Sequence, residues 1–228
     1  MQAVHDALTA APSSDLSQMR DSLQAYLTAQ GGVRRMRAVL DGAPALDRAR
    51  WRALAELGVQ AMLVPEPQGG LGLAVRDAMA AAEELGRFLQ PEPVACGAWQ
   101  AALLLASLPA SQPRDALLRG IAAGEVVAGV AWTGEDLGMT AGTPVAAPAD
   151  ADGWLVQDAT RLLWVPADAP GLRLDRVTRA DGSALARLDG SAAATRPQDL
   201  LGEGGALKTA WEAATAATRL LLAAEALG

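Results

Sequence analysis

The first half of the chain carries apolar residues at intervals of three and four, the period of an amphipathic α-helix. The pattern predicts helices over residues 14–28, 33–40, 46–57, 75–89, 99–107 and 114–123. Ser13 or Ser14 is placed to cap the first of them, and Gly58 suits the left-handed position that ends the third. Pro91 and Pro93 separate the fourth helix from the fifth. This part of the chain is therefore predicted to be all helical.

The predicted helices differ in how much of their surface should be buried. For the helix over 75–89, the residues expected inside are Met79, Ala82, Leu85 and Phe88, and those expected outside are Glu83, Glu84 and Arg87. A last helix is predicted over 206–227, where Leu207, Trp211, Leu221 and Leu222 are separated by alanine. Only Lys208, Glu212, Arg219 and Glu225 are charged there, so we expect most of its circumference to be covered.

The pattern changes at Val126, where short runs of apolar residues replace the helical period. The runs VVAGVAW, TPVAA, WLV, LLWV and LRL are separated by glycine, proline and aspartate, which is typical of short strands. They predict a small β unit of five or six strands that extends to about Leu188. LGEGG, at 201–205, reads as a glycine-rich hinge before the last helix.

The predicted fold class is α+β, in three parts. Residues 1–125 form an N-terminal all-α domain with a helical-bundle architecture, and residues 126–200 form a small β-sheet or barrel domain. Residues 201–228 carry one helix of an incomplete C-terminal helical bundle.

The stretch LVPEPQGGLGL, residues 63–73, raises the possibility of a phosphate-binding loop. It lacks the third glycine of a dinucleotide-binding fingerprint and the lysine of a P-loop, and no convincing strand precedes it. We therefore interpret it as a turn. Two prolines stop one element, and Gly69, Gly70 and Gly72 are expected to supply positive-φ positions.

Charge and composition exclude several classes of function. The chain has 228 residues, 51% hydrophobic content, a net charge of −7 and a pI near 4.7, which argues against nucleic-acid binding. Cys96 and His5 are the only cysteine and histidine, so we expect no disulfide, no metal site and no Ser-His-Asp or Cys-His nucleophile. No leader or membrane-spanning run is evident, and a cytoplasmic location is the expectation.

Carboxylates and aromatic residues remain as candidate chemistry. The adjacent Glu83 and Glu84 point to different parts of a helix surface and cannot act together on one substrate. The pair Glu135 and Asp136 and the two glutamates of the last helix, Glu212 and Glu225, are expected to be solvated, so no catalytic residue is assigned.

A second group of candidates lies in the β unit. Thr133 follows a predicted strand, where its hydroxyl could bind a ligand or the turn beneath it. Trp132, Trp154 and Trp164 are concentrated there in an aromatic-poor chain. Tryptophans in a small sheet are usually core residues, although a flat cofactor would also stack on them.

Six strings occur in order along the chain: WRALAELGVQAMLVPEPQGGLGL, AAEELGRFLQPEPV, LLRGIAAGEVVAGVAWT, DGWLV, WVPADAPGL and LLGEGGAL, the last leading into an alanine-rich helix. From about residue 16 onward this set resembles the acyl-CoA dehydrogenase family. The resemblance implies a helical domain, a middle β domain and a C-terminal four-helix bundle. It also implies FAD-dependent α,β-dehydrogenation of an acyl-CoA thioester in fatty acid metabolism, with the adenosine part of FAD reaching a neighbouring subunit.

The same resemblance implies where the flavin is held. Thr133 occupies the place of the threonine in a T-E-P-x-x-G-S-D run, which here reads TGEDLGMTAG. A tryptophan that packs on the isoalloxazine corresponds either to Trp164, followed by Val165, or to Leu162, if intervening strands have been lost. Trp132, Thr133 and Trp164 are therefore the predicted cofactor-binding residues.

In the family, the catalytic glutamate follows the segment that corresponds to residue 228, so no base is assigned in this chain. Three alternatives follow. The chain is an acyl-CoA dehydrogenase-like flavoprotein that is not competent alone, a non-catalytic partner of a full-length acyl-CoA dehydrogenase, or an inactive gene fragment. The apolar last helix predicts a homo- or hetero-oligomer in the first two cases.

Overall fold

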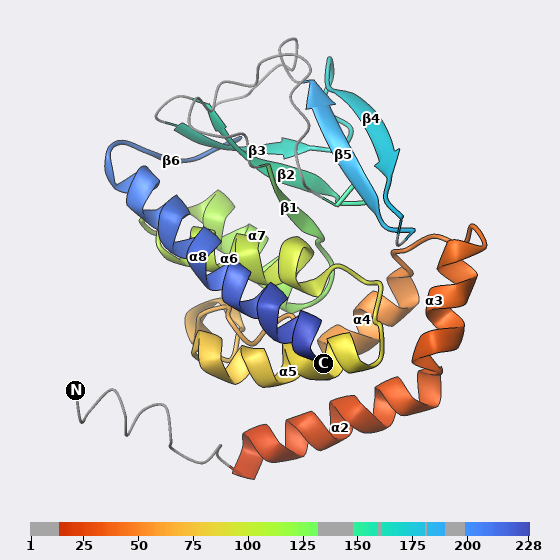
Figure 1. Cartoon of the computed structure of the whole chain (residues 1–228). Helices are drawn as coiled ribbons and strands as arrows, with labels where there is room; N and C mark the ends of the chain where they lie inside the picture. The colour runs from red at the N-terminus through yellow and green to blue at the C-terminus, as the bar shows by residue number, and fades with distance from the viewer. Residues whose placement is uncertain (1–13, 132–147, 159–160, 181, 190–198) are drawn as a thin grey trace.

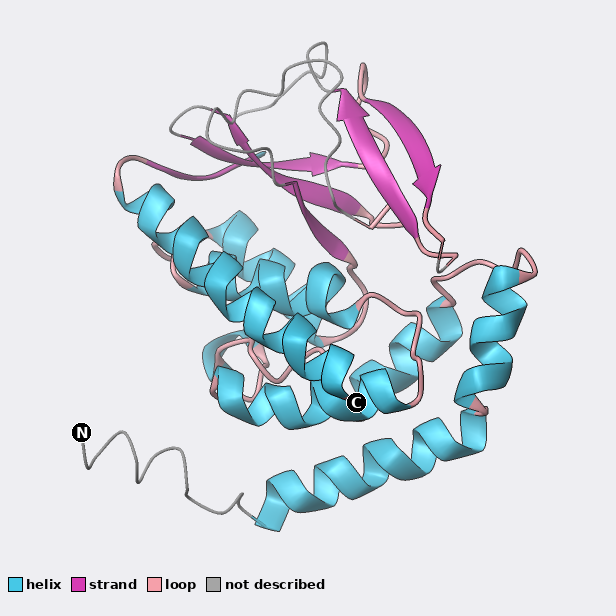
Figure 2. Cartoon of the chain, in the orientation of Figure 1, coloured by secondary structure: helices cyan, strands magenta, loops and turns pink. Residues whose placement is uncertain are grey.

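The computed structural model describes residues 14–131, 148–158, 161–180, 182–189 and 199–228. Helices lie below a small β layer in Figures 1 and 2. The helical segments are α2 (Ser14–Gln30), α3 (Gly32–Leu40), α4 (Arg48–Glu56), the 3-10 turn η1 (Glu66–Gln68), α5 (Val75–Arg87), the π-helical turn η2 (Ala95–Trp99), α6 (Gln100–Ala106), α7 (Gln112–Ala122) and α8 (Ala206–Leu227). The predicted helices are thus confirmed, with small changes at their ends.

Within the described residues, the β layer contains six strands: β1 (Ala128–Ala131), β2 (Gly153–Asp158), β3 (Arg161–Pro166), β4 (Arg173–Thr178), β5 (Ala184–Asp189) and β6 (Leu200–Glu203). Four of them form a sheet in the order β1-β2-β3-β6, in which β1 and β2 are parallel and the other pairs antiparallel. Strands β4 and β5 form an antiparallel hairpin that a bridge between Pro148 and Leu185 joins to the chain ahead of β2. The α+β class is therefore confirmed.

One apolar core continues from the helices into the sheet. Trp51 of α4 and Trp99 of η2 are completely buried among the helices, and Trp154 of β2 is completely buried in the sheet. The indole N–H groups of Trp99 and Trp154 donate to the carbonyl oxygens of Val59 and Pro148. For Trp154, the usual role of a tryptophan as a core residue holds.

An ion pair joins the helical layer to the start of the sheet. Arg48, in the first turn of α4, donates to both carboxylate oxygens of Asp152 at 2.8 Å and to the carbonyl of Asp150 at 3.1 Å. Asp152 also accepts from the main-chain N–H of Val127 at 2.7 Å. A single bidentate pair thus ties together α4, the entry to β1 and the entry to β2.

The glycine-rich stretch is a turn, as predicted, but its glycines have two different roles. Gly69 and Gly72 have φ of +81° and +59°, in the left-handed region that favours glycine. Gly70 does not have positive φ, which corrects the prediction. A Cβ on Gly70 would come within 1.9 Å of the carbonyl oxygen of Val64, so glycine is required there for close backbone packing.

Three other predictions are corrected by the structure. Glu84 is buried, not exposed, because Arg20 of α2 donates to its carboxylate at 2.7 Å and Arg87 lies 3.4 Å from the same oxygen. The helix expected from residue 99 begins earlier, as the π-helical turn at Ala95. The segment read as a hinge contains β6, which pairs with β3.

Helix α8 lies across α5, α6 and η2 (Figure 1), and a glycine permits its close approach to α5. A Cβ on Gly86 would come within 1.7 Å of the carbonyl oxygen of Glu225. The apolar residues buried on α8 are Leu207, Trp211, Ala214, Leu221 and Ala224. Most of the circumference was expected to be covered, but Leu220 and Leu227 are 53% and 82% exposed, so only one side of the helix is covered within the described residues.

Candidate functional site

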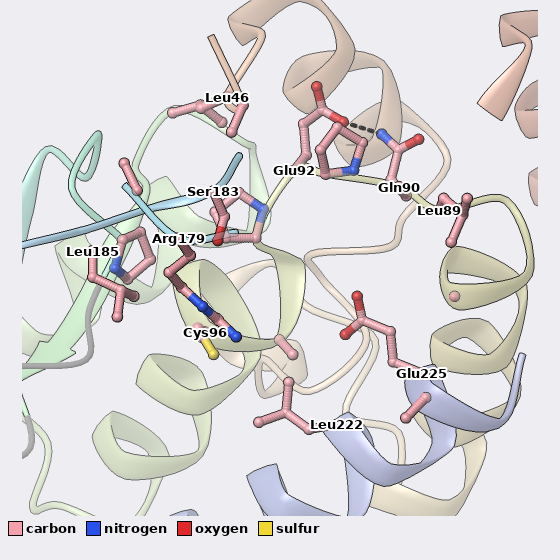
Figure 3. Close-up of a pocket in the computed structure, with 18 of the residues that line it drawn as sticks. Leu46, Leu89, Gln90, Glu92, Cys96, Arg179, Ser183, Leu185, Leu222 and Glu225 are labelled. Carbon is pink, nitrogen blue, oxygen red and sulfur yellow. Dashed lines mark hydrogen bonds between the residues drawn. The ribbon is translucent and has the colours of Figure 1, made fainter. Parts of the chain in front are cut away.

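A cavity of about 1180 Å³ lies where the C-terminal ends of α5 and α8 approach η2 and the β4–β5 hairpin. Figure 3 shows it in close-up. Five stretches that are far apart in the sequence contribute to its wall: the α3 helix and the loop after it, residues 86–100, residues 148–150, the hairpin turn and the C-terminal half of α8. Its volume is somewhat larger than the roughly 300–1,000 Å³ of typical small-molecule sites.

Much of the cavity wall is aliphatic. Leu46, Leu89, Leu185 and Leu222 all point toward the cavity, each from a different segment of the chain. Leu89 has a φ of +49°, and within the described residues it is the one non-glycine with positive φ. Such a conformation is costly for a leucine, so the turn after α5 is held in it by the surrounding structure.

A buried ion pair supports the wall beside this turn. Arg35 of α3 donates to the carboxylate of Glu92 at 3.0 Å and to the carbonyls of Pro44 and Ala45 at 2.7 and 2.9 Å. The side chains of Arg35 and Glu92 are 8% and 0% exposed. Gln90 donates to the second carboxylate oxygen of Glu92. Burial raises the pKa of Glu92, and the hydrogen bond and charge of Arg35 act in the opposite direction.

Three polar side chains from three segments meet at another part of the wall. The carboxyl group of Glu225 extends from α8 into the cavity, and the guanidinium of Arg179 points from the hairpin turn toward the thiol of Cys96 (Figure 3). Burial raises the pKa of Glu225 to about 7. In the described part of the chain, no donor lies within hydrogen-bonding or ion-pairing distance of this carboxyl group.

Cys96 is unsuited to act as a nucleophile. The pKa of its thiol is raised to about 11, chiefly by burial and also by the negative charge of Glu225, while Arg179 partly opposes the rise. The thiol is therefore protonated at neutral pH, whereas a reactive cysteine needs a lowered pKa. Both Glu225 and Arg179 lie close enough to Cys96 for their charges to act on it.

The predicted cofactor-binding residues are only partly within the described residues. Trp132 and Thr133 lie outside them, as do Glu135 and Asp136. Trp164 lies on β3, opposite Leu155 of β2, and its indole covers Gly153, where a Cβ would come within 2.5 Å of the ring. This indole remains partly exposed. Trp164 is not among the residues that line the cavity.

Sequence reasoning missed Glu225 and Arg179 as cavity residues. Glu225 was expected to be solvated, because it lies on a helix whose neighbours could not be identified from the sequence. Its neighbours in the sequence could have indicated this position, because Glu225 is the single carboxylate next to Leu221, Leu222 and Ala224, and Leu221 and Ala224 are buried. For Arg179, in a polar hairpin turn, the sequence contains no such signal.

The described residues lack two features. They contain no cluster of three or more His, Cys, Asp or Glu side chains arranged to hold a metal ion. In the same residues, none of the helices has the length and hydropathy needed to cross a bilayer.

Comparison with known proteins identifies the fold and the family. Residues 13–125 match the family described as acyl-CoA dehydrogenase, N-terminal domain. The acyl-CoA dehydrogenase IpdE2 of Mycobacterium tuberculosis is 31% identical over 118 residues, which is 51% of this chain and 37% of IpdE2. The chain belongs to the acyl-CoA dehydrogenase family. The predicted resemblance is thereby confirmed.

Solved structures extend this likeness beyond the helices. A variant of the Tcur3481-Tcur3483 steroid ACAD is 25% identical with a TM-score of 0.74, over 92% of this chain and 62% of that one. A glutaryl-CoA dehydrogenase from Mycobacterium smegmatis in complex with FADH2 has a TM-score of 0.75 at 17% identity, over 96% of this chain and 62% of that one. The chain thus spans less than two thirds of the length of these relatives.

Proposed function

We propose that this chain binds the acyl group of an acyl-CoA thioester in the cavity and takes part in FAD-dependent α,β-dehydrogenation. The observation that carries the proposal is the large, mostly aliphatic cavity between α5, α8 and the β4–β5 hairpin, in a chain of this family. An acyl chain needs an apolar site, and the leucines of the wall supply apolar surface.

Acyl-CoA binding can be tested with a variant that fills the cavity from the protein surface. Ala226 is exposed on the last turn of α8 and lines the cavity, so Ala226→Trp should obstruct it without disturbing the core. We expect an affinity for octanoyl-CoA, measured by calorimetry, that is lower by about tenfold or more, because a pocket contact of this size is worth roughly 1–3 kcal/mol. Ala206→Trp is the control, since Ala206 is also exposed on α8 but does not line the cavity. Equal affinities for the two variants would refute the site.

FAD is the proposed cofactor, and it would accept the hydride when bound. Of the residues proposed to hold it, Trp132, Thr133 and Trp164, only Trp164 lies within the described residues. Its indole is partly exposed and held on the sheet by Gly153, which fits a surface on which a flat ring stacks. The glutaryl-CoA dehydrogenase of like fold is in complex with FADH2, which supports the proposal.

The visible absorbance spectrum of the chain, after incubation with FAD and desalting, tests this part. A retained flavin band that is lost in Trp164→Ala would support it, and colourless native protein would refute FAD binding by this chain. If flavin is retained, reduction of an electron acceptor in the presence of acyl-CoA then tests catalysis. No reduction with any acyl-CoA would rule out catalysis by this chain alone.

A second candidate function is that of a subunit that completes an acyl-CoA dehydrogenase through α8. Its exposed face carries apolar residues at alternating intervals of three and four: Ala213, Ala216, Leu220, Ala223 and Leu227. This spacing is typical of a helix that packs along another helix, and alanine permits close approach. The Tcur3481-Tcur3483 steroid ACAD, whose name joins two proteins, supports an assembly of this kind.

The mass of the chain in solution tests the second candidate. We expect an oligomer, alone or with a co-expressed full-length acyl-CoA dehydrogenase, and its dissociation by Leu220→Glu. Lys208→Glu, at an exposed position outside the apolar face of α8, is the control and should leave the mass unchanged. A monomer under both conditions would refute the proposed assembly.

A further inference from the structure

The carboxyl group of Glu225 is a feature of the cavity that a plain hydrocarbon ligand does not explain. It is partly buried and extends from α8 into the cavity. Within the described residues it has no hydrogen-bond or ion-pair partner. A polar group that is shielded from solvent without a partner costs free energy. An apolar ligand next to Glu225 would offer no hydrogen bond to offset this cost.

Its neighbours narrow the chemistry of a ligand that could satisfy it. Arg179 and Glu225 both act on the thiol of Cys96, so a positive and a negative group lie close to the same thiol. A cationic group of the ligand would be repelled by Arg179, and an anionic group would be repelled by the ionised carboxylate. A neutral group that donates a hydrogen bond is compatible with both charges.

A hydroxyl group meets these requirements. It can donate to the carboxylate when Glu225 is ionised, and it can accept from the carboxylic acid when Glu225 is protonated. Its second bonding position can face the guanidinium of Arg179 or the hydroxyl of Ser183, which also line the cavity. The protonated thiol of Cys96 adds a weak donor that does not change the charge.

We propose that Glu225, with Arg179 and Cys96, forms a polar subsite that selects acyl-CoA thioesters whose acyl group carries a hydroxyl at a distance from the thioester. This inference rests on the proposed acyl-CoA binding and specifies its substrate class. Glu225 is a specificity-determining residue here, and no part in bond breaking is assigned to it. Leu46, Leu89 and Leu222 line the rest of the path taken by the hydrocarbon part of the acyl group.

The test compares the unsubstituted and terminally hydroxylated forms of hexanoyl-, octanoyl- and decanoyl-CoA by calorimetry. For at least one chain length, we expect the hydroxylated form to bind about tenfold or more tightly, which corresponds to a hydrogen bond to a charged group. Glu225→Leu should abolish or reverse this preference, whereas Glu225→Gln, which retains an acceptor, should keep most of it. Glu212→Leu, at an exposed position on the same helix, is the control and should preserve the preference.

The outcomes separate the subsite from acyl-CoA binding as such. Binding of unsubstituted acyl-CoA that equals or exceeds that of every hydroxylated form would overturn the subsite and leave the proposed function intact. A preference that persists in Glu225→Leu would also overturn it, provided that the variant keeps the circular dichroism spectrum of the native chain. No binding of any acyl-CoA would refute the proposed function and this inference together.

Discussion

Removal of Arg35 should leave a completely buried carboxylate without its cation. The side chain of Glu92 is 0% exposed, and Arg35 is its one ion-pair partner in the described part of the chain. Gln90 and the main-chain N–H of Asp47 would remain as neutral donors to this carboxylate. Arg35→Met keeps most of the side-chain volume but removes the charge. Breaking a buried pair from one side costs about 3–5 kcal/mol, a large fraction of the roughly 5–15 kcal/mol that stabilises a typical domain.

Urea unfolding followed by circular dichroism at neutral pH measures this loss. Arg34→Met is the matched control, because Arg34 is the preceding residue of the same helix and is exposed, and it should cost less than about 0.5 kcal/mol. The double variant Arg35→Met/Glu92→Gln should recover part of the loss, since no buried charge is then left unpaired.

The pH dependence supplies an independent check. Burial already raises the pKa of Glu92, and loss of the opposing effect of Arg35 should raise it further. The folded variant would then take up a proton at a pH where the unfolded chain is still ionised, so its deficit relative to the native chain should shrink as the pH falls toward 5. A loss no larger than that of Arg34→Met, or a deficit independent of pH, would refute the reasoning.

Three further predictions follow from the packing and charges. Gly86→Ala should cost about 1–3 kcal/mol because its Cβ would meet the carbonyl oxygen of Glu225, whereas Gly205→Ala, with nothing within 4 Å, should be nearly neutral in the same urea assay. Glu225→Gln should remove a pH dependence of stability. Because the pKa of about 7 in the folded chain exceeds the ordinary value of 4.5, the stability of the native chain should fall by up to about 3 kcal/mol as the pH rises from 4.5 to 7. A curve of stability against pH that is parallel for the variant would contradict this. Asp152→Ala should destabilise the fold more than Arg48→Ala, because Asp152 also accepts from the N–H of Val127. The half-exposed ion pair between Arg48 and Asp152 is alone worth only about 1 kcal/mol, and equal losses for the two variants would contradict this.

The local part of the fold could be predicted from the sequence, because local signals specify it. Apolar periodicity located the helices, and glycines in left-handed conformation ended or turned them at Gly58, Gly69 and Gly72. The failures share a different cause. Glu84 is buried by an arginine 64 residues away in the sequence, and β6 is a strand only because β3 pairs with it. Neither partner can be identified from periodicity.

The same limit applies more strongly to the cavity. Its wall combines five separated segments, so the polarity of one residue, such as Glu225, does not reveal what it faces. The resemblance to a family predicted the fold and a flavin site at Trp132, Thr133 and Trp164, and the flavin site stays a prediction. It did not predict Glu225, because a residue that sets specificity depends on the individual cavity and not on the shared fold.

The contact between Gly86 and Glu225 makes the distance between two helices a determinant of ligand recognition. The main-chain carbonyl of Glu225 rests on α5 at a glycine, while its side chain points into the cavity. A methyl group added at this crossing would push the whole last turn of α8 outward and carry the carboxyl group with it. Residue 86 therefore acts as a spacer whose size sets how deep the carboxyl group reaches. Relatives with a larger residue here should recognise ligands of a different length, even where every other residue of the cavity wall is unchanged.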